Sequence, residues 1–140
     1  MRPLAVAYPN DKSLAAVDDE YLFGPDLLVA PMTGPGDVRN VHLPSGKWVD
    51  FWTGATITGG QQIESSAPIN RIPVFVRHRS EIPLQLSPTL ALGDSMTAGR
   101  VRALLVAGTE DRAKGFSAHS GVSAIILIGN GQRQVLKIAK

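Results

Sequence analysis

The sequence predicts a mainly β protein: an antiparallel β-sandwich over roughly residues 24–84, preceded by a strand and a short helix and extended by a β-hairpin tail. Three local patterns support this fold class. The apolar run Leu27–Ala30, between a Gly-Pro pair and Pro31, has the length of a buried strand. Residues 47–52 alternate between two faces, and turn-forming residues flank them. Near the C-terminus, Gly129-Asn130-Gly131 separates two apolar segments and is typical of a tight hairpin turn.

The N-terminal residues predict one strand and one short helix. Pro3–Tyr8 is apolar and ends at the turn-forming Pro9-Asn10-Asp11, so we expect a strand there. In Ser13–Leu22, apolar residues recur at helical spacing, and Ser13 is placed to cap the first turn. We therefore expect one or two helical turns before the sandwich begins.

The middle of the chain predicts a hairpin and a strand. Weak alternation interrupted by Gly59-Gly60 favours a hairpin over Ala55–Glu64, with Ile57 and Ile63 pointing inward. Residues 72–77 alternate more cleanly and predict a strand. A turn at His78–Glu81 then leads to a further extended segment.

The tail predicts strands separated by polar connections. Residues 85–97 are turn-rich, with one short strand expected at 89–92, and 108–121 is a polar loop. Arg100–Ala107 predicts a strand with its odd-numbered residues 101, 103 and 105 inward. Val122–Ile128 and Arg133–Ile138 form the terminal hairpin. This organisation divides the chain into residues 1–23, 24–84 and 85–140.

Composition narrows the possible functions. The chain has 140 residues and 44% hydrophobic content, enough for one domain of ordinary size. A formal charge of +2, with no basic block interleaved with aromatics, argues against nucleic-acid binding. No cysteine is present, which excludes a disulfide framework and thiol chemistry. The sequence contains no signal peptide and no membrane-length apolar run, so we expect no membrane partner and assign no compartment.

No residue pattern points to catalysis, a cofactor or a metal. Asp18-Asp19-Glu20 is the densest group of carboxylates, but neighbours along a helix do not face one another, and solvated charges are expected. His42, His78 and His119 lack the spacing of metal ligands. Ser117-Ala118-His119-Ser120 lacks a nucleophile elbow and is interpreted as loop hydroxyls. Gly129-Asn130-Gly131 precedes a strand pattern, so it is no dinucleotide loop.

Trp48 and Trp52, with Asp50 between them, form the most informative aromatic group. Alternation with period two puts all three on one strand face, where two aromatic rings and a carboxylate could stack on sugar rings. Large aromatics at this spacing more often fill the space between a sheet and the layer packed on it. We therefore single out Trp48, Asp50 and Trp52 as residues for sugar contact or contact with another domain.

Several motifs occur in a fixed order along the first 84 residues. They are Phe23-Gly24-Pro25-Asp26-Leu27-Leu28-Val29-Ala30-Pro31, Leu43-Pro44-Ser45-Gly46-Lys47-Trp48-Val49-Asp50-Phe51-Trp52-Thr53-Gly54, Ala67-Pro68-Ile69 and Ile72-Pro73-Val74-Phe75-Val76-Arg77. Together they resemble glycoside hydrolase family 31, which includes α-glucosidases and α-xylosidases. The resemblance is to the join between that family's catalytic barrel and the β-sandwich that follows. Residues beyond 84 match only loosely.

This resemblance implies a function that depends on a partner. Pro3–Tyr8 would correspond to the last strand of an eight-fold barrel, and Tyr8-Pro9-Asn10-Asp11 matches the family's aromatic-Pro-x-Asp turn. The family hydrolyses α-glycosidic bonds with retention, using two aspartates on earlier barrel strands. Those positions would precede Met1, so we expect a noncatalytic segment that supports the catalytic barrel of a parent enzyme.

One turn departs from the family pattern. The family has small residues, Ala-Gly, where this chain has His78-Arg79. If the turn requires a positive φ, Arg79 is strained by about 1 kcal/mol relative to glycine.

Two other classes of function stay open. One is a carbohydrate-binding β-sandwich that uses Trp48 and Trp52. The other is an interaction module that self-associates, because a face left uncovered by a missing domain favours dimers or aggregates.

Overall fold

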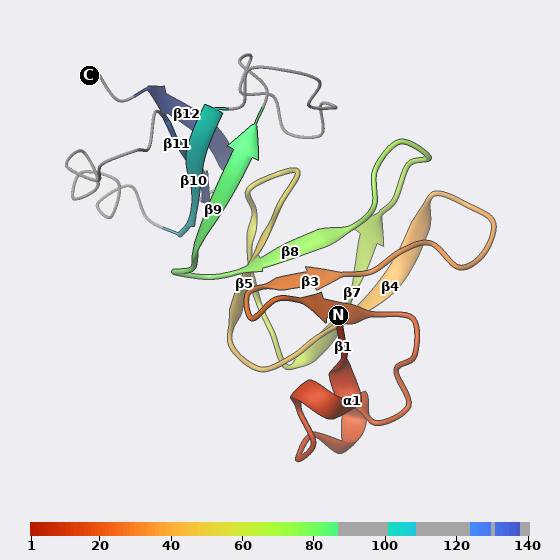
Figure 1. Cartoon of the computed structure of the whole chain (residues 1–140). Helices are drawn as coiled ribbons and strands as arrows, with labels where there is room; N and C mark the ends of the chain where they lie inside the picture. The colour runs from red at the N-terminus through yellow and green to blue at the C-terminus, as the bar shows by residue number, and fades with distance from the viewer. Residues whose placement is uncertain (87–100, 109–123, 130, 138–140) are drawn as a thin grey trace.

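The computed structural model describes residues 1–86, 101–108, 124–129 and 131–137, and confirms a mainly β fold (Figure 1). In chain order the elements are β1 (Arg2–Pro3), α1 (Leu4–Ala7), the 3-10 helix η1 (Lys12–Leu14), β2 (Tyr21–Phe23), β3 (Leu27–Val29), β4 (Val38–Leu43), β5 (Lys47–Asp50), β6 (Thr56–Thr58), β7 (Gln61–Ser66), β8 (Val74–Arg77), β9 (Glu81–Leu86), β10 (Val101–Ala107), β11 (Ala124–Gly129) and β12 (Gln132–Lys137). No helix among these elements is long and apolar enough to cross a membrane.

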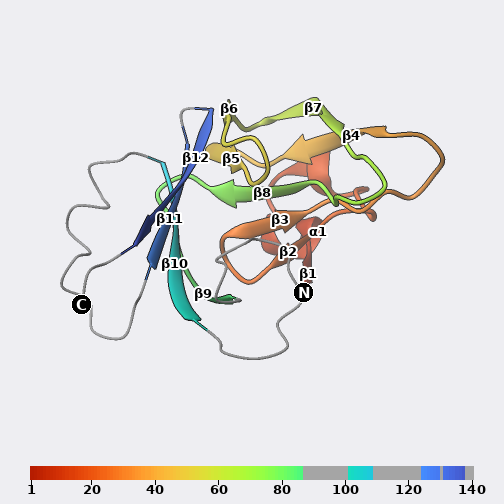
Figure 2. The same cartoon turned by 90° about the horizontal axis from the view of Figure 1, so that it is seen from above.

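The strands form three sheets. A central sheet has six strands in the order β1-β2-β3-β8-β5-β6, a second sheet pairs β4 with β7, and a third has the order β12-β11-β10-β9. The strand pairs in these three sheets are antiparallel except β10 with β11, which are parallel. Figures 1 and 2 show the four-stranded sheet to one side of β5 and β8, with β4 and β7 on the other side.

Both faces of the central sheet are buried. Trp48 and Phe75 point into a first core, which also contains Leu4, Leu14, Val17, Leu22, Leu28, Ala30, Val41 and Leu43. Their chain neighbours Val49 and Val76 point into a second core, shared with Leu105, Ala107, Ile126 and Ile128 of the four-stranded sheet. Successive strand residues point to opposite faces, so β5 and β8 contribute to both cores. The tail therefore supplies a third layer to the predicted sandwich.

Most strands with clear local patterns are confirmed. The apolar run becomes β3, the alternating segments become β5 and β8, and the tail supplies β10 and the β11–β12 hairpin. Leu105 points inward as expected and is 1% exposed. The strand expected at 89–92, most of the loop at 108–121, and His119 with its serine neighbours lie outside the described residues. The division at residue 84 stays a prediction; β9, which pairs with β10, begins at Glu81.

The prediction of a strand over Pro3–Tyr8 is wrong beyond its first residue. Only Arg2 and Pro3 pair with β2, after which Leu4–Ala7 form a helical turn closed by the Tyr8 N–H donating to the Leu4 carbonyl at 2.8 Å. This turn places Leu4 in the first core, while Val6 is 65% exposed. An isolated strand has no ladder partner beyond β2, and a helical turn satisfies its own backbone.

The helix predicted over Ser13–Leu22 is also mostly wrong. Only Lys12–Leu14 is helical, and its cap is Asp11, whose Oδ1 accepts from the Ser13 N–H at 3.0 Å. Tyr21 and Leu22 instead form β2, because pairing with β3 buries Leu22 in the first core.

The hairpin predicted over Ala55–Glu64 does not form. β6 pairs with β5, whereas β7 pairs with β4, so Gly59-Gly60 crosses from one sheet to the other. A Cβ on Gly59 would lie 1.8 Å from the Pro44 carbonyl oxygen, which makes glycine necessary at this crossing. Ile57 and Ile63 do pack against the first core, as expected.

The turn at Arg79 does require a positive φ. Arg79 has φ 69°, and among the described residues it is the non-glycine residue with positive φ. Its N–H donates to the Ala107 carbonyl at 2.7 Å, so the turn connects β8 to the four-stranded sheet.

Candidate interdomain interface

The residues before β2 (1–20), called the N-terminal segment below, are attached to the sandwich through Arg77. The Arg77 Nη2 donates to the Tyr8 hydroxyl at 2.6 Å, which joins residues 69 positions apart in the sequence. The same nitrogen donates to the Pro25 carbonyl at 3.3 Å. Arg77 thus contacts both Tyr8 of the N-terminal segment and Pro25 of the β2–β3 turn.

Two further contacts hold the Arg77 side chain in place. Its guanidinium carbon lies 4.6 Å from the centroid of the Trp48 ring, a cation–π arrangement. Its Nε lies 3.5 Å from Oδ1 of Asp26. Because β8 pairs Arg77 directly with Trp48 of β5, the two side chains lie on the same face of the central sheet.

An open hollow of about 710 Å³ lies beside this attachment. Its walls come from residues 7–13, which include the Tyr8-Pro9-Asn10-Asp11 turn, and from Ser45 of the β4–β5 connection. Apolar side chains are also exposed in the N-terminal part: Met1 at 84%, Val6 at 65% and Phe23 at 59%. The residues before β2 are therefore packed against the sandwich through Leu4, Leu14 and Val17, while Met1 and Val6 stay exposed.

The structure separates the three residues that the sequence grouped on one face. Trp48 is fully buried, and its indole N–H donates to the Pro44 carbonyl at 2.9 Å. β5 ends at Asp50, whose Oδ1 accepts from the Trp52 and Thr53 N–H groups at 2.8 and 3.1 Å. This side-chain turn removes Trp52 from the strand, so the expected shared face of Trp48 and Trp52 does not form.

Trp52 is half-buried and is contacted by Ile72, Arg71 and Phe51 rather than by Trp48. Its indole N–H donates to the Ile72 carbonyl at 2.8 Å, and the Arg71 guanidinium carbon lies 5.1 Å from its ring centroid. Phe51 meets the Trp52 ring edge-on, with centroids 4.9 Å apart. A sugar cannot stack on the buried Trp48, and Arg71 occupies a face of Trp52.

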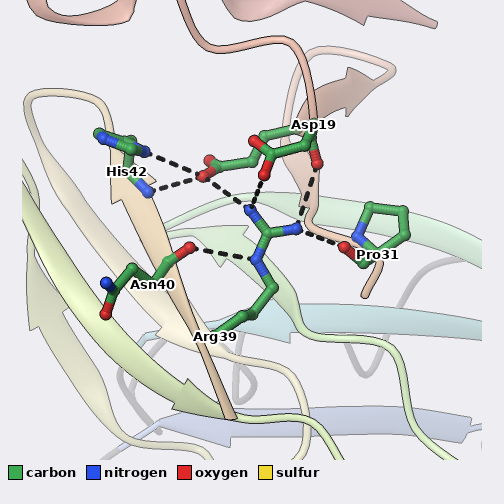
Figure 3. Close-up of polar contacts among 6 residues, drawn as sticks. Asp19, Pro31, Arg39, Asn40 and His42 are labelled. Atoms are coloured by element: carbon green, nitrogen blue, oxygen red, sulfur yellow. Dashed lines mark hydrogen bonds and ion pairs between the residues drawn. The ribbon is translucent and has the colours of Figure 1, made fainter. Parts of the chain in front are cut away.

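A second polar cluster connects β4 to the segment before β2 (Figure 3). Arg39 Nη2 lies 3.0 Å from Asp19 Oδ2 and 3.3 Å from Glu20 Oε1. Arg39 Nη1 donates to the Asp19 and Pro31 carbonyls, and Nε donates to the Asn40 carbonyl at 3.1 Å. All five N–H groups of the guanidinium therefore have partners.

Glu20 is buried at the centre of this cluster, which corrects the expectation of solvated charges. Its side chain is 0% exposed, and Oε1 accepts from the His42 backbone N–H at 2.8 Å and lies 3.3 Å from His42 Nδ1. Burial raises the pKa of the Glu20 carboxyl, while the contacts from His42 and the Arg39 charge oppose that shift. The cluster fastens β4 to the chain leading into β2.

These carboxylates are not arranged for glycoside cleavage. Asp19 and Glu20 both contact Arg39 Nη2, so a guanidinium occupies the space between their oxygens. A retaining glycosidase needs that space for the sugar and the leaving group. Within the described ranges, no group of three or more His, Cys, Asp or Glu side chains could hold a metal ion.

The sequence interpretation missed Arg39, the burial of Glu20 and the strand β4. The sequence did contain a signal for β4. Arg39 alternates with two apolar residues, Val41 and Leu43, so the three side chains share one strand face. A charged residue on a buried face needs a buried partner. Nothing local indicated that Glu20 would supply it from 19 positions away.

The fold and this interface define a β-sandwich domain with a short N-terminal segment packed on it. The chain belongs to glycosyl hydrolase family 31: residues 1–82 match the model described as the C-terminal domain of that family. The resemblance predicted from the motifs is thereby confirmed.

The relatives are long enzymes of which this chain matches a small part. It is 37% identical over 97 residues to isomaltosyltransferase of Sporosarcina globispora, covering 69% of this chain and 9% of the relative. It is 41% identical over 85 residues to α-glucosidase 2 of Bacillus thermoamyloliquefaciens, covering 60% and 11%. The structure resembles the cycloalternan-forming enzyme from Listeria monocytogenes with a TM-score of 0.71 and 33% identity, covering 78% and 11%.

Proposed function

We propose that this chain is a noncatalytic domain that supports the catalytic barrel of a family 31 enzyme, one that hydrolyses α-glucosides with retention. The observation that carries the proposal is the attachment of the N-terminal segment to the sandwich through Tyr8 and Arg77, 2.6 Å apart. By resemblance, this segment is the end of the barrel. A sandwich that holds this segment would fix the end of the barrel in place.

Buried apolar contacts strengthen this attachment. Leu4 is fully buried in the first core together with Leu14 and Val17, and Ala7 and Tyr8 pack against the same core. Burying one leucine side chain contributes about 1.5–3 kcal/mol. Two leucines and one valine before β2, Leu4, Leu14 and Val17, therefore bind the segment firmly to the sandwich.

The open hollow beside the N-terminal segment is consistent with a large partner domain packing there. The hollow at residues 7–13 borders the turn that, by resemblance, ends the last barrel strand. The rest of the barrel would pack here. The matched part of this chain spans only 9% and 11% of the length of two relatives. The remainder of each relative is long enough to form such a barrel.

The names of the relatives support the proposed substrate class. They include an α-glucosidase and an α-xylosidase, at 41% and 38% identity. Asp50 and Trp52 are proposed as interdomain contacts rather than a sugar platform, because Arg71 lies over the Trp52 ring. Maltose should accordingly leave the tryptophan fluorescence of this chain unchanged.

The test is complementation between two chains. α-Glucosidase 2 of Bacillus thermoamyloliquefaciens would be produced without the 85-residue segment that this chain matches, alone or together with this chain. We expect the two chains to co-purify and to regain hydrolysis of a p-nitrophenyl α-glucoside, while this chain alone shows none. Turnover by the purified chain alone would contradict a noncatalytic role. Absence of both co-purification and regained hydrolysis would contradict a supporting role.

A further inference from the structure

The Glu20 side chain contacts the outer edge of β4. In the sheets formed by the described residues, β4 pairs only with β7. The His42 N–H of β4 donates instead to Glu20 Oε1, at 2.8 Å. A carboxyl oxygen from the N-terminal segment thus takes the place of the carbonyl that a neighbouring strand would provide. This contact holds the segment against the strand edge.

The two carboxyl oxygens of Glu20 have different surroundings. Oε1 accepts from the His42 N–H and lies 3.3 Å from both Arg39 Nη2 and His42 Nδ1. Oε2 is buried and has no hydrogen-bond partner among the described residues. A buried O–H without an acceptor costs less free energy than a buried, negatively charged oxygen without a donor. The site therefore suits a protonated carboxyl, with Oε1 as its carbonyl oxygen and the proton on Oε2.

The charges that face Glu20 do not favour its ionisation enough to reverse this preference. They come from Arg39 and His42 of β4 and from Asp19 of the same segment. Arg39 Nη2 lies closer to Asp19, at 3.0 Å, than to Glu20, at 3.3 Å, so one carboxylate already balances its charge. His42 is charged only if protonated, so its attraction for a carboxylate weakens as pH rises. Ionised Glu20 would add an excess negative charge on a side chain that is 0% exposed.

Ionisation of Glu20 is therefore easier when the segment moves away from β4. Burial raises the pKa of Glu20 in the closed arrangement. The closed arrangement is favoured while the carboxyl is protonated, and this preference is lost as pH rises through the raised pKa. Residues 18–20 lie between η1 and β2 and belong to no helix or strand, so they can move without breaking a strand pair.

We propose that Glu20 is a pH-sensitive latch: its protonated carboxyl holds residues 18–20 against the edge of β4, and its ionisation loosens that contact while the sandwich stays folded. In acid the segment is closed on β4, and in alkaline solution it opens and exposes the His42 N–H. The latch is a property of the chain itself and does not depend on the proposed enzyme-supporting function.

NMR spectroscopy of the complete chain over a series of pH values tests the latch. The carboxyl carbon of Glu20 should titrate above the ordinary glutamate pKa of 4.5. Over the same pH range, the protection of the His42 amide against hydrogen exchange, corrected for the intrinsic effect of pH, should fall at least about threefold. The control is the Phe51 amide, which donates to the Val74 carbonyl of β8 at 2.9 Å and should keep its protection.

Two isosteric substitutions separate the latch from a merely structural contact. Glu20→Gln keeps a side-chain acceptor but cannot ionise, so the protection of the His42 amide should no longer vary with pH. Asp19→Asn removes a neighbouring negative charge and should move the Glu20 titration to lower pH, because a like charge disfavours ionisation. The titration of the unaltered chain tests the proposal even if Glu20→Gln does not fold.

Three results would overturn the proposal. The first is a Glu20 carboxyl that titrates in the ordinary glutamate range. The second is a His42 amide whose protection is the same at every pH. The third is joint loss of protection at the His42 and Phe51 amides, because that result would mean unfolding of the whole sandwich rather than opening of one contact.

Discussion

The Arg39 guanidinium and the Glu20 carboxylate lie 3.3 Å apart, and their side chains are 9% and 0% exposed. This buried ion pair fastens β4 to the segment before β2, and Asp19 and His42 complete the cluster. A buried pair of this kind adds little net stability, but removal of one partner leaves the other charge buried and unpaired.

Arg39→Met is therefore expected to destabilise the protein by about 3–5 kcal/mol. The variant leaves Glu20 buried without its cation and removes the donors to the Asp19 and Pro31 carbonyls. Urea denaturation followed by tryptophan fluorescence measures the change. The double variant Arg39→Met with Glu20→Leu should recover part of the loss; a loss below about 1 kcal/mol for Arg39→Met alone would show that the pair is unimportant.

The stability contribution of Glu20 should depend on pH. Burial raises the pKa of Glu20 in the folded state. A raised pKa means that the folded state favours the protonated carboxyl, so its stabilising contribution is present below the unfolded pKa and is lost as pH rises through the folded pKa.

Glu20→Gln removes this dependence. Relative to the parent chain, the variant should gain stability as pH rises from the ordinary glutamate range towards neutrality. Denaturation midpoints at several pH values measure the difference. Glu64→Gln, at an exposed position on β7, serves as the control and should show no such gain. A difference between Glu20→Gln and parent that is constant with pH would contradict the prediction.

Arg79 should be less favourable than glycine in its turn. At φ 69°, a side chain brings its Cβ close to the backbone, which costs about 1 kcal/mol. We expect Arg79→Gly to be more stable than Arg79→Ala by about that amount, since both remove the guanidinium and only alanine keeps a Cβ. Thermal unfolding of the pair measures the difference, and an alanine variant as stable as the glycine variant would exclude backbone strain.

Tyr8 and Arg77 should be energetically coupled. Tyr8→Phe removes the hydroxyl that accepts from Arg77 at 2.6 Å, and is expected to cost about 1 kcal/mol. The matched control is Tyr21→Phe, at another half-buried tyrosine. A double-mutant cycle with Arg77→Ala, measured by urea denaturation, isolates the pair. Additive effects of the two substitutions would mean that the hydrogen bond does not attach the segment.

Strands with strong local patterns were predictable because their causes are local. β3 is a short apolar run between chain breakers, β5 and β8 alternate with period two, and the two strands of the terminal hairpin flank the sequence Gly129-Asn130-Gly131. The family motifs occur in these same segments. The small residues that the family has at this turn raised the question of a positive φ, and Arg79 adopts one, with φ 69°.

Strand pairing and burial depended on distant parts of the chain. Gly59-Gly60 is compatible locally with a hairpin, but β6 and β7 join different sheets because each has a longer-range partner in β5 or β4. Leu4 lies in a helical turn because the first core accepts its side chain from that direction. Glu20 can be buried because Arg39, 19 residues later in the sequence, forms an ion pair with its carboxylate.

The same distinction applies to the candidate site residues. Period two placed Trp48 and Trp52 on one face, yet the Asp50 carboxylate ends the strand by accepting the Trp52 and Thr53 N–H groups. Local sequence sets where strands form, since backbone preference and turn chemistry act over a few residues. Which sides become buried, and which charges meet, follows from packing three sheets together, and that packing joins residues far apart in the chain.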